Sequence, residues 1–182
     1  MIRVLLFYFL LVQLLFGYNY DDLLLKAQAS IFPKIMLLDK KIENKLVKNK
    51  IIYTIVYDGS DYQTALHVKK YIETTFKGRF DKYPYEIHLV DFSHLSTDTK
   101  ASAFYVLKSS TKNIQKAAKI AYEKRIISFS YDINNLKYGL LFSLIIENST
   151  VLYLNKEYLH IKNIDFGDFL LQMVKFIDKN SI

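Results

Sequence analysis

The chain has 182 residues, contains no cysteine and carries a net charge of +7. The lack of cysteine excludes disulfide bonds, thiol catalysis, cysteine-ligated metal sites and lipoprotein acylation. The basic residues are scattered along a chain rich in Lys, Asn, Ile, Tyr and Phe, which is typical of an AT-rich genome, so the charge does not indicate nucleic acid as a partner.

Residues 1–17 have the pattern of a secretory signal peptide. Arg3 precedes an apolar run of roughly thirteen residues, which is too short for a stable membrane span, and the small residue Gly17 follows. We therefore expect export to the periplasm, cleavage after Gly17, and a mature chain over 18–182 that forms one domain with no membrane span. An N-terminal anchor that stays uncleaved is the alternative.

The mature chain is expected to open with a helix. Asp21 or Asp22 can cap this helix, and residues at helical spacing follow, namely Leu24, Ala27, Gln28, Ile31 and Ile35. Pro33 lies inside this pattern and should kink or split the helix. The charged stretch from Lys40 to Lys50 predicts a loop that leads to the first strand.

Strands and helices alternate after this loop. The apolar, β-branched stretch over 51–57 predicts a strand that is buried on both faces. It is followed by a helix over about 61–76, strands over 85–92 and 101–107, a helix over about 112–124 and a strand over 126–131. This alternation predicts an α/β fold, a Rossmann-like sandwich with a mostly parallel sheet flanked by helices.

The pattern changes after residue 139. Two β-rich runs, 140–147 and 151–155, are joined by a short polar turn and predict an antiparallel hairpin at one edge of the sheet. An amphipathic helix over about 166–178 is expected to close the fold. Its buried stripe would consist of Leu170, Met173, Val174 and Ile177.

This order of elements resembles the YfiR-like family of periplasmic regulatory proteins. The resemblance is carried by "ASAFYVLKSS", "IISFSYD", "LLFSLIIENSTVLYLNK" and "IKNIDFGDFLLQMVKFI", which are similar to the family's two polar-ended strands, its hairpin and its last helix. The chain departs from the family in its lack of cysteine and in having only Gly139 where members often have a Gly-Gly pair. The resemblance implies a single YfiR-like α/β domain over 18–182, without catalytic machinery.

The same resemblance implies a function. Such proteins are typically regulators that touch the periplasmic part of an inner-membrane signalling protein, often a diguanylate cyclase or a sensor kinase. We therefore expect a non-enzymatic periplasmic regulator or adaptor that modulates the output of such a partner. A homodimer is compatible with this role.

Polar residues follow the predicted strands at the ends that parallel strands bring to one edge of a sheet, where ligands usually bind. These residues are Tyr57, Asp58, Ser109, Ser110, Thr111, Tyr131 and Asp132. This rim is either a site for a ligand or partner, or a set of turns that the aspartates cap, with Ser110 or Thr111 capping the next helix. Asn135 and Tyr138 belong to an expected exposed loop over 131–139, which is either a partner contact or an ordinary loop.

Catalytic and metal-binding motifs are absent from the sequence. The chain has no H-E-x-x-H, no G-x-S-x-G and no Gly-rich phosphate loop, and its four histidines lack the spacing of metal ligands. We therefore predict no enzyme activity, no cofactor and no metal. The rival to the regulatory role is a small periplasmic solute-binding protein that uses the rim.

Overall fold

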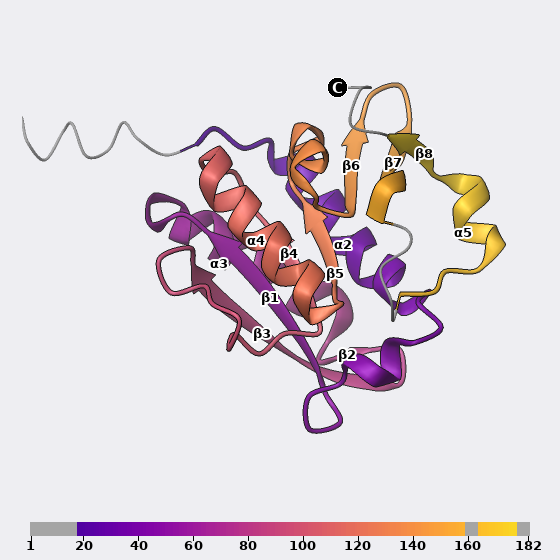
Figure 1. Cartoon of the computed structure of the whole chain (residues 1–182). Coiled ribbons are helices and arrows are strands. Elements are labelled where there is room, and N and C mark those ends of the chain that lie inside the picture. Colours follow the sequence, from indigo (N-terminus) through magenta and orange to yellow (C-terminus); the bar gives the residue numbers. More distant parts are fainter. Residues whose placement is uncertain (1–17, 159–163, 178–182) are drawn as a thin grey trace, which may run out of the picture.

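The computed structural model describes residues 18–158 and 164–177. It contains an eight-stranded sheet with the strand order β2-β3-β1-β4-β5-β6-β7-β8 and helices on both of its faces (Figure 1). The predicted α/β fold with a mostly parallel sheet is therefore confirmed. The predicted signal peptide over 1–17 lies outside the described residues.

Parallel strands form the centre of the sheet. They are, in spatial order, β3 (Tyr83–Asp91), β1 (Ile51–Tyr57), β4 (Ala103–Val106), β5 (Ile127–Ser130) and β6 (Phe142–Ile146). At one edge, the short strand β2 (Arg79–Phe80), which the sequence pattern did not reveal, is antiparallel to β3. At the other edge, β7 (Thr150–Asn155) is antiparallel to β6, as the predicted hairpin requires, and β8 (Lys175–Ile177) is parallel to β7.

Two hydrophobic cores lie on the two faces of the sheet. The first packs against α2 (Asp22–Leu37), α3 (Tyr62–Phe76) and α5 (Asp168–Met173), and the second packs against α4 (Thr111–Lys124). Short 3-10 helices complete the connections: η1 (Ile42–Lys45), η2 (Gly59–Asp61), η3 (Ile133–Tyr138) and η4 (Lys156–Tyr158). Within residues 18–158 and 164–177, no helix combines the length and the apolar character that a membrane span needs.

Strand β1 shows how the sequence specifies a sheet covered on both faces. Tyr53 and Ile55 point into the first core, whereas Val56 points into the second. Successive side chains of a strand alternate between faces, so a strand with two covered faces must be apolar throughout. All residues of β1 except Tyr57 are buried, which matches the unbroken apolar run in the sequence.

Helix α2 is continuous from Asp22 to Leu37, so of the predicted kink or split at Pro33, the split does not occur. Asp21 caps the helix by accepting a hydrogen bond from the backbone N–H of Leu24 at 2.7 Å. Pro33 removes one helical hydrogen bond, but it is buried, and Phe32 and Met36 beside it are fully buried. The Phe32 ring also stacks on Phe129 with 4.5 Å between ring centroids. Tertiary packing therefore holds the helix together across the proline.

The predicted closing helix over 166–178 is wrong. Helix α5 ends at Met173, the backbone of Val174 is extended, and β8 follows it along β7. Leu170 and Val174 are buried in the first core and Ile177 in the second, whereas Met173 is 52% exposed. Pairing with β8 provides hydrogen-bond partners for backbone groups along the outer side of β7. Residues 175–177 therefore form a strand, although their sequence pattern is helical.

Candidate functional site

The carboxyl ends of β1, β4 and β5 lie at one edge of the sheet, because the three strands are parallel and in register. Val56 is aligned with Val106, and Val106 with Ser130. The segments that follow these strands therefore meet at this edge, which we call the rim. The rim is formed by Tyr57, Asp58, Asp61, Lys108, Ser109, Ser110, Thr111, Tyr131 and Asp132.

Asp58 and the start of α4 are joined by hydrogen bonds. The Ser109 hydroxyl donates to Asp58 Oδ2 at 2.7 Å, and Asn113 Nδ2 donates to Ser109 Oγ at 2.9 Å. Ser110 caps α4, since its hydroxyl oxygen accepts from the backbone N–H of Asn113 at 3.4 Å. Thr111 is the first residue of the helix and is exposed. Ser110 thus has a structural role, while Asp58 and Ser109 form a half-buried polar pair.

Tyr131 and Asp132 lie at the same rim but face different neighbours. The Tyr131 hydroxyl oxygen accepts a hydrogen bond from the backbone N–H of Asp21 at 2.8 Å. Asp132 Oδ1 accepts from the backbone N–H and the side-chain amide of Asn134, both at 2.9 Å. Asp132 therefore caps the turn that follows its own strand, and its hydrogen bonds do not reach Asp58.

The segment over 131–139, expected to be an exposed loop, is largely buried or half-buried, which corrects the prediction for Tyr131 and Asn135. The segment folds into η3, where Tyr131 is 5% and Asn135 9% exposed. Asn135 Nδ2 donates to Ser130 Oγ at 3.1 Å, so this side chain is held inside the fold. Tyr138 is half-buried and lines a hollow of about 240 Å³ together with Tyr122 and Tyr158.

The segment over 18–21 crosses the rim, which the sequence analysis did not foresee (Figure 1). The Tyr20 hydroxyl donates to Asp61 Oδ2 at 2.7 Å and accepts from the backbone N–H of Lys108 at 3.0 Å. The Tyr20 ring meets the Tyr131 ring edge to face at 4.8 Å. Lys108 Nζ donates to the carbonyl oxygen of Asn19 at 2.6 Å and lies 5.2 Å from the centroid of the Tyr131 ring.

Burial is the largest cause of the pKa shifts of Asp61 and Tyr20, which meet where the segment over 18–21 crosses the rim. Asp61 is 3% exposed, and desolvation raises the pKa of its carboxyl, although hydrogen bonds from Tyr20 and from the Tyr18 amide oppose the rise. Burial, followed by the hydrogen bond to Asp61, also raises the pKa of Tyr20 far above its ordinary value. Both groups are thus desolvated at a sheet edge where a strand-end site would be open to water.

Asp61 and Lys108 are rim residues that the sequence did not single out, and both lie in loops that follow predicted strands. Asp61 ends the "DGSD" turn after β1, and Lys108 precedes the serines after β4. The polar character of both residues and their place in strand-end loops are the sequence signals that could identify them. Their contacts with Tyr20 could not be foreseen, because Tyr20 and Asp61 are 41 positions apart in the chain.

The described rim groups are mainly engaged with one another. Asp58 accepts from Ser109, Asp61 from Tyr20, and the Tyr131 hydroxyl from Asp21. In the described ranges 18–158 and 164–177, no group of three or more His, Cys, Asp or Glu residues could hold a metal ion. The arrangement is suited to holding an extended segment across the ends of the strands.

Comparison with known proteins adds information on the fold. No family model and no curated protein matches the chain. A conserved domain protein from Vibrio cholerae is similar in structure, with 13% sequence identity, a TM-score of 0.52, and coverage of 76% of this chain and 60% of that protein. The ABC domain in complex with L-Trp from Streptococcus pneumoniae has 12% identity, a TM-score of 0.50 and the same coverages of 76% and 60%.

The chain therefore spans about three fifths of the length of each of these two structures, since 60% of each is covered. At 13% and 12% identity, the likeness concerns the α/β fold alone.

Proposed function

We propose that this protein is a periplasmic, non-enzymatic regulator or adaptor. It docks on the periplasmic part of an inner-membrane signalling protein, a diguanylate cyclase or a sensor kinase, and changes the output of that partner. Three features of the sequence support the proposal: the signal-peptide pattern over 1–17, the YfiR-like order of elements, and the lack of a recognisable catalytic motif.

The observation that carries the docking role is an apolar patch on α5 and β8. Phe169 is 70%, Met173 52% and Phe176 45% exposed. Phe169 and Met173 are four residues apart on one face of α5. Phe176 is aligned with Leu154, which is buried in the same core as Leu170 of α5, so Phe176 lies on the same side of the sheet as α5.

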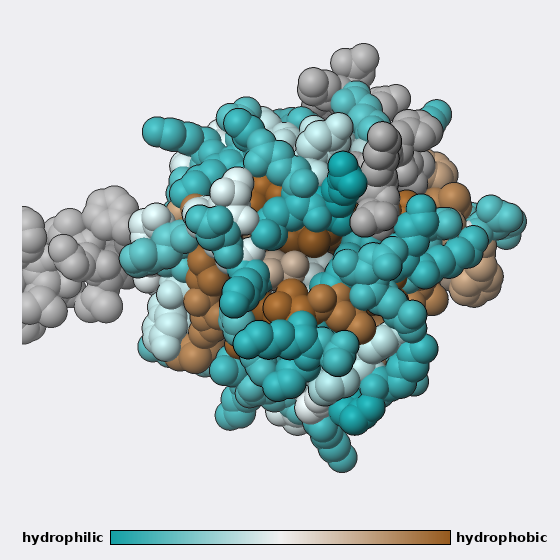
Figure 2. Space-filling model, turned by 60° about the horizontal axis from the view of Figure 1, so that its bottom comes forward, coloured by the Kyte–Doolittle hydropathy of each residue, from teal (hydrophilic) through white to brown (hydrophobic). Residues whose placement is uncertain are grey.

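Figure 2 shows apolar residues at the right-hand side of the molecule, where Figure 1 places α5. Phe and Met are enriched at the centres of protein–protein interfaces, which favours exposed side chains of these types as points of contact with a partner. The patch formed by Phe169, Met173 and Phe176 is therefore the surface that we assign to the signalling partner.

The patch is held on a well-anchored support. Leu170 is 1% exposed in the first core, and the Phe166 ring meets Phe142 edge to face at 5.2 Å. The backbone N–H of Asp165 donates to the buried carboxylate of Asp39 at 2.8 Å. A pre-ordered surface loses less conformational entropy on binding, which favours its use for docking.

The test uses cross-linked cell envelopes. We expect the native protein to recover an inner-membrane protein that has a periplasmic part and a cyclase or kinase output domain. Phe169→Ser should abolish this recovery and leave Tm unchanged, because the side chain is 70% exposed. Tyr122→Ser, which alters a 56% exposed aromatic residue of α4 on the opposite face, is the matched control and should leave recovery intact. Failure of the native protein to recover any such partner would refute the proposal.

The second candidate function is binding of a small solute at the rim. The structurally similar Streptococcus domain is described in complex with L-Trp, and in this chain Tyr131 and Lys108 lie at the rim beneath the segment over 18–21. In this alternative, the solute replaces the segment over 18–21. A ligand at a hundredfold excess over its Kd should then stabilise the fold by about 2.7 kcal/mol.

A thermal-shift screen of free amino acids separates the two functions. Tyr20→Ala should strengthen solute binding, because it removes the group that competes for the rim. If no amino acid shifts Tm of either the native protein or Tyr20→Ala, the docking function is favoured.

A further inference from the structure

Asp61 is a buried carboxylate without a charged partner among the described residues. It is 3% exposed, Oδ2 accepts from the Tyr20 hydroxyl at 2.7 Å, and Oδ1 accepts from the backbone nitrogen of Tyr18 at 3.3 Å. Within 18–158 and 164–177, no ion pair joins it to a Lys, Arg or His side chain, and its acidic neighbour Asp58 adds repulsion. Burial of a carboxylate is costly unless a positive group accompanies it.

The nitrogen that faces Asp61 belongs to the first residue after the expected cleavage point. In the full chain, the Tyr18 nitrogen is a peptide amide. Hydrolysis of the bond between Gly17 and Tyr18 consumes one water, leaves a carboxylate on Gly17 and leaves a protonated amine on Tyr18. The same nitrogen atom, 3.3 Å from Asp61 Oδ1, would then carry a positive charge.

We propose that cleavage after Gly17 completes this site, and that the α-ammonium group of Tyr18 forms an ion pair with Asp61. Asp61 is the receptor for the new N-terminus, and the ion pair locks the segment over 18–21 across the rim. The inference rests on the export assumed in the proposed function, but it does not depend on the identity of a docking partner.

The lock has consequences for the whole rim because the segment carries other contacts. When Tyr18 is fixed, the Tyr20 hydroxyl keeps its hydrogen bond from the backbone N–H of Lys108. The Tyr131 hydroxyl likewise keeps its hydrogen bond from the backbone N–H of Asp21. The segment also holds Lys108 Nζ on the Asn19 carbonyl oxygen. The segment already makes these contacts in the full chain, so processing at Gly17 would strengthen the cover over the strand ends.

The charged and titratable groups around the pair define its pH window. Asp58 lies on the same turn as Asp61, Tyr20 bonds to Asp61, and Lys108 is engaged with Asn19 and the tyrosine rings. Two carboxylates near one ammonium raise its pKa above the ordinary value of about 7.7 to 8.0. The pair requires an ionised Asp61 and a protonated amine. Its stabilisation is therefore lost as the pH falls through the pKa of Asp61, which burial raises, and lost again as the pH rises through the raised pKa of the amine.

The experiment compares a chain that begins with a free amine at Tyr18 with a chain that retains Gly17. The extra residue moves the ammonium about 3.8 Å along the chain, out of contact with Asp61. We expect Tm of the chain beginning at Tyr18 to be higher by roughly 3 to 8 °C at pH 7. The difference should disappear when the pH is high enough to deprotonate the amine.

Asp61→Asn should abolish this difference, whereas Asp132→Asn, which alters the rim aspartate that caps its own turn, should preserve it. Equal Tm values for the two native-sequence chains, or a difference that survives Asp61→Asn, would overturn the inference. If Asp61→Asn does not fold, the pKa of the ¹⁵N-labelled Tyr18 amine decides: a value at or below about 7.7 contradicts the ion pair.

Mass spectrometry of the protein recovered from the periplasm supplies a separate check. We expect its first residue to be Tyr18. A different N-terminus would overturn the inference while leaving the docking function intact, and capture of the signalling partner would test the latter on its own.

Discussion

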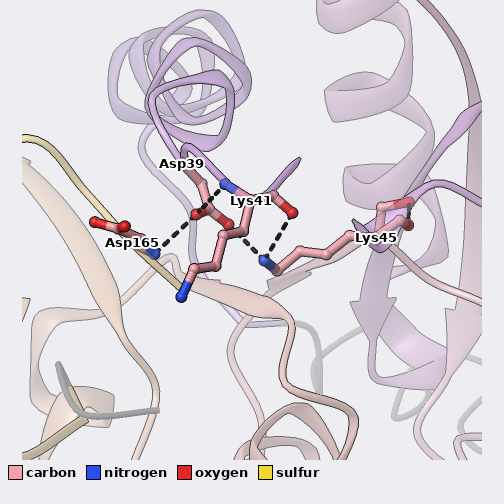
Figure 3. A network of polar contacts seen from close by, with 5 residues as sticks. Asp39, Lys41, Lys45 and Asp165 are labelled. Atoms are coloured by element: carbon pink, nitrogen blue, oxygen red, sulfur yellow. Dashed lines mark hydrogen bonds and ion pairs between the residues drawn. The ribbon is translucent and has the colours of Figure 1, made fainter. Parts of the chain in front are cut away.

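The strongest structural prediction concerns the ion pair between Asp39 and Lys45, because both side chains are buried. Asp39 follows α2 and is 0% exposed at its side chain, while Lys45 ends η1 and is 2% exposed, with 2.5 Å between Nζ and Oδ2 (Figure 3). Asp39 Oδ1 also accepts from the backbone N–H groups of Lys41 at 3.1 Å and Asp165 at 2.8 Å. The carboxylate thus joins α2, η1 and the segment that leads to α5.

The perturbation is Lys45→Met, which keeps the length of the side chain and removes its charge. The carboxylate of Asp39 then stays buried with two backbone N–H donors and without a cation. Leaving one member of a buried pair uncompensated costs about 3–5 kcal/mol. For a chain of this size, each 1 kcal/mol lowers Tm by roughly 2–4 °C, so the expected loss in Tm is roughly 6–20 °C.

Urea unfolding of four proteins measures the coupling: native, Lys45→Met, Asp39→Asn and the double variant. We expect the double variant to be more stable than Lys45→Met, because it leaves no buried charge. Lys40→Met is the control, since Lys40 lies 3.7 Å from Asp165 with side chains 62% and 43% exposed. Exposed pairs contribute about 0–1 kcal/mol. If Lys45→Met costs no more than Lys40→Met, or if the two single changes at positions 39 and 45 are additive, the reasoning fails.

Three further predictions follow from local geometry. In urea unfolding, Gly139→Ala should destabilise the fold by more than Gly78→Ala. Both glycines have a positive φ, so each substitution strains the backbone. A Cβ at position 139 would also lie 2.5 Å from the Tyr158 hydroxyl, whereas no atom lies within contact of a Cβ at position 78. Ser110→Ala should cost about 1 kcal/mol in the same assay, because it removes the cap of α4. Burial raises the pKa of Tyr53 and Tyr105 well above the ordinary value, so the folded state keeps protons that the unfolded state loses, and the free energy of unfolding should fall as the pH rises above about 10. A free energy of unfolding that is the same at pH 9 and at pH 11 would contradict this last expectation.

The sequence was most informative where structure depends on local periodicity. The apolar run over 51–57 became β1 with the predicted bounds, and the apolar spacing of Ile114, Ala117, Ala118 and Ala121 became the buried face of α4. The parallel order of β1, β4 and β5 followed from the alternation of strands and helices, so residues at the strand ends could be assigned to one edge.

The sequence was misleading where distant segments compete for the same residues. The stretch after Phe166 has a helical pattern, yet β7 draws residues 175–177 into the sheet. Asn135 has the polarity of an exposed loop residue, yet Ser130 gives it a buried hydrogen-bond partner. In each case the outcome depends on a neighbour that the local pattern cannot reveal.

Composition and periodicity alone therefore determined the α/β class, the edge of the sheet that carries the polar strand ends, and the exclusion of cysteine chemistry. Only the tertiary structure decided what covers that edge and which charges are buried. Asp21 meets Tyr131 across 110 positions, and Asp165 meets Asp39 across 126. Hydrogen bonds of this kind form because the folded sheet brings the partners together. The periodicities of 2 residues in strands and 3.6 residues in helices carry information only about near neighbours in the chain, so they cannot predict such pairs.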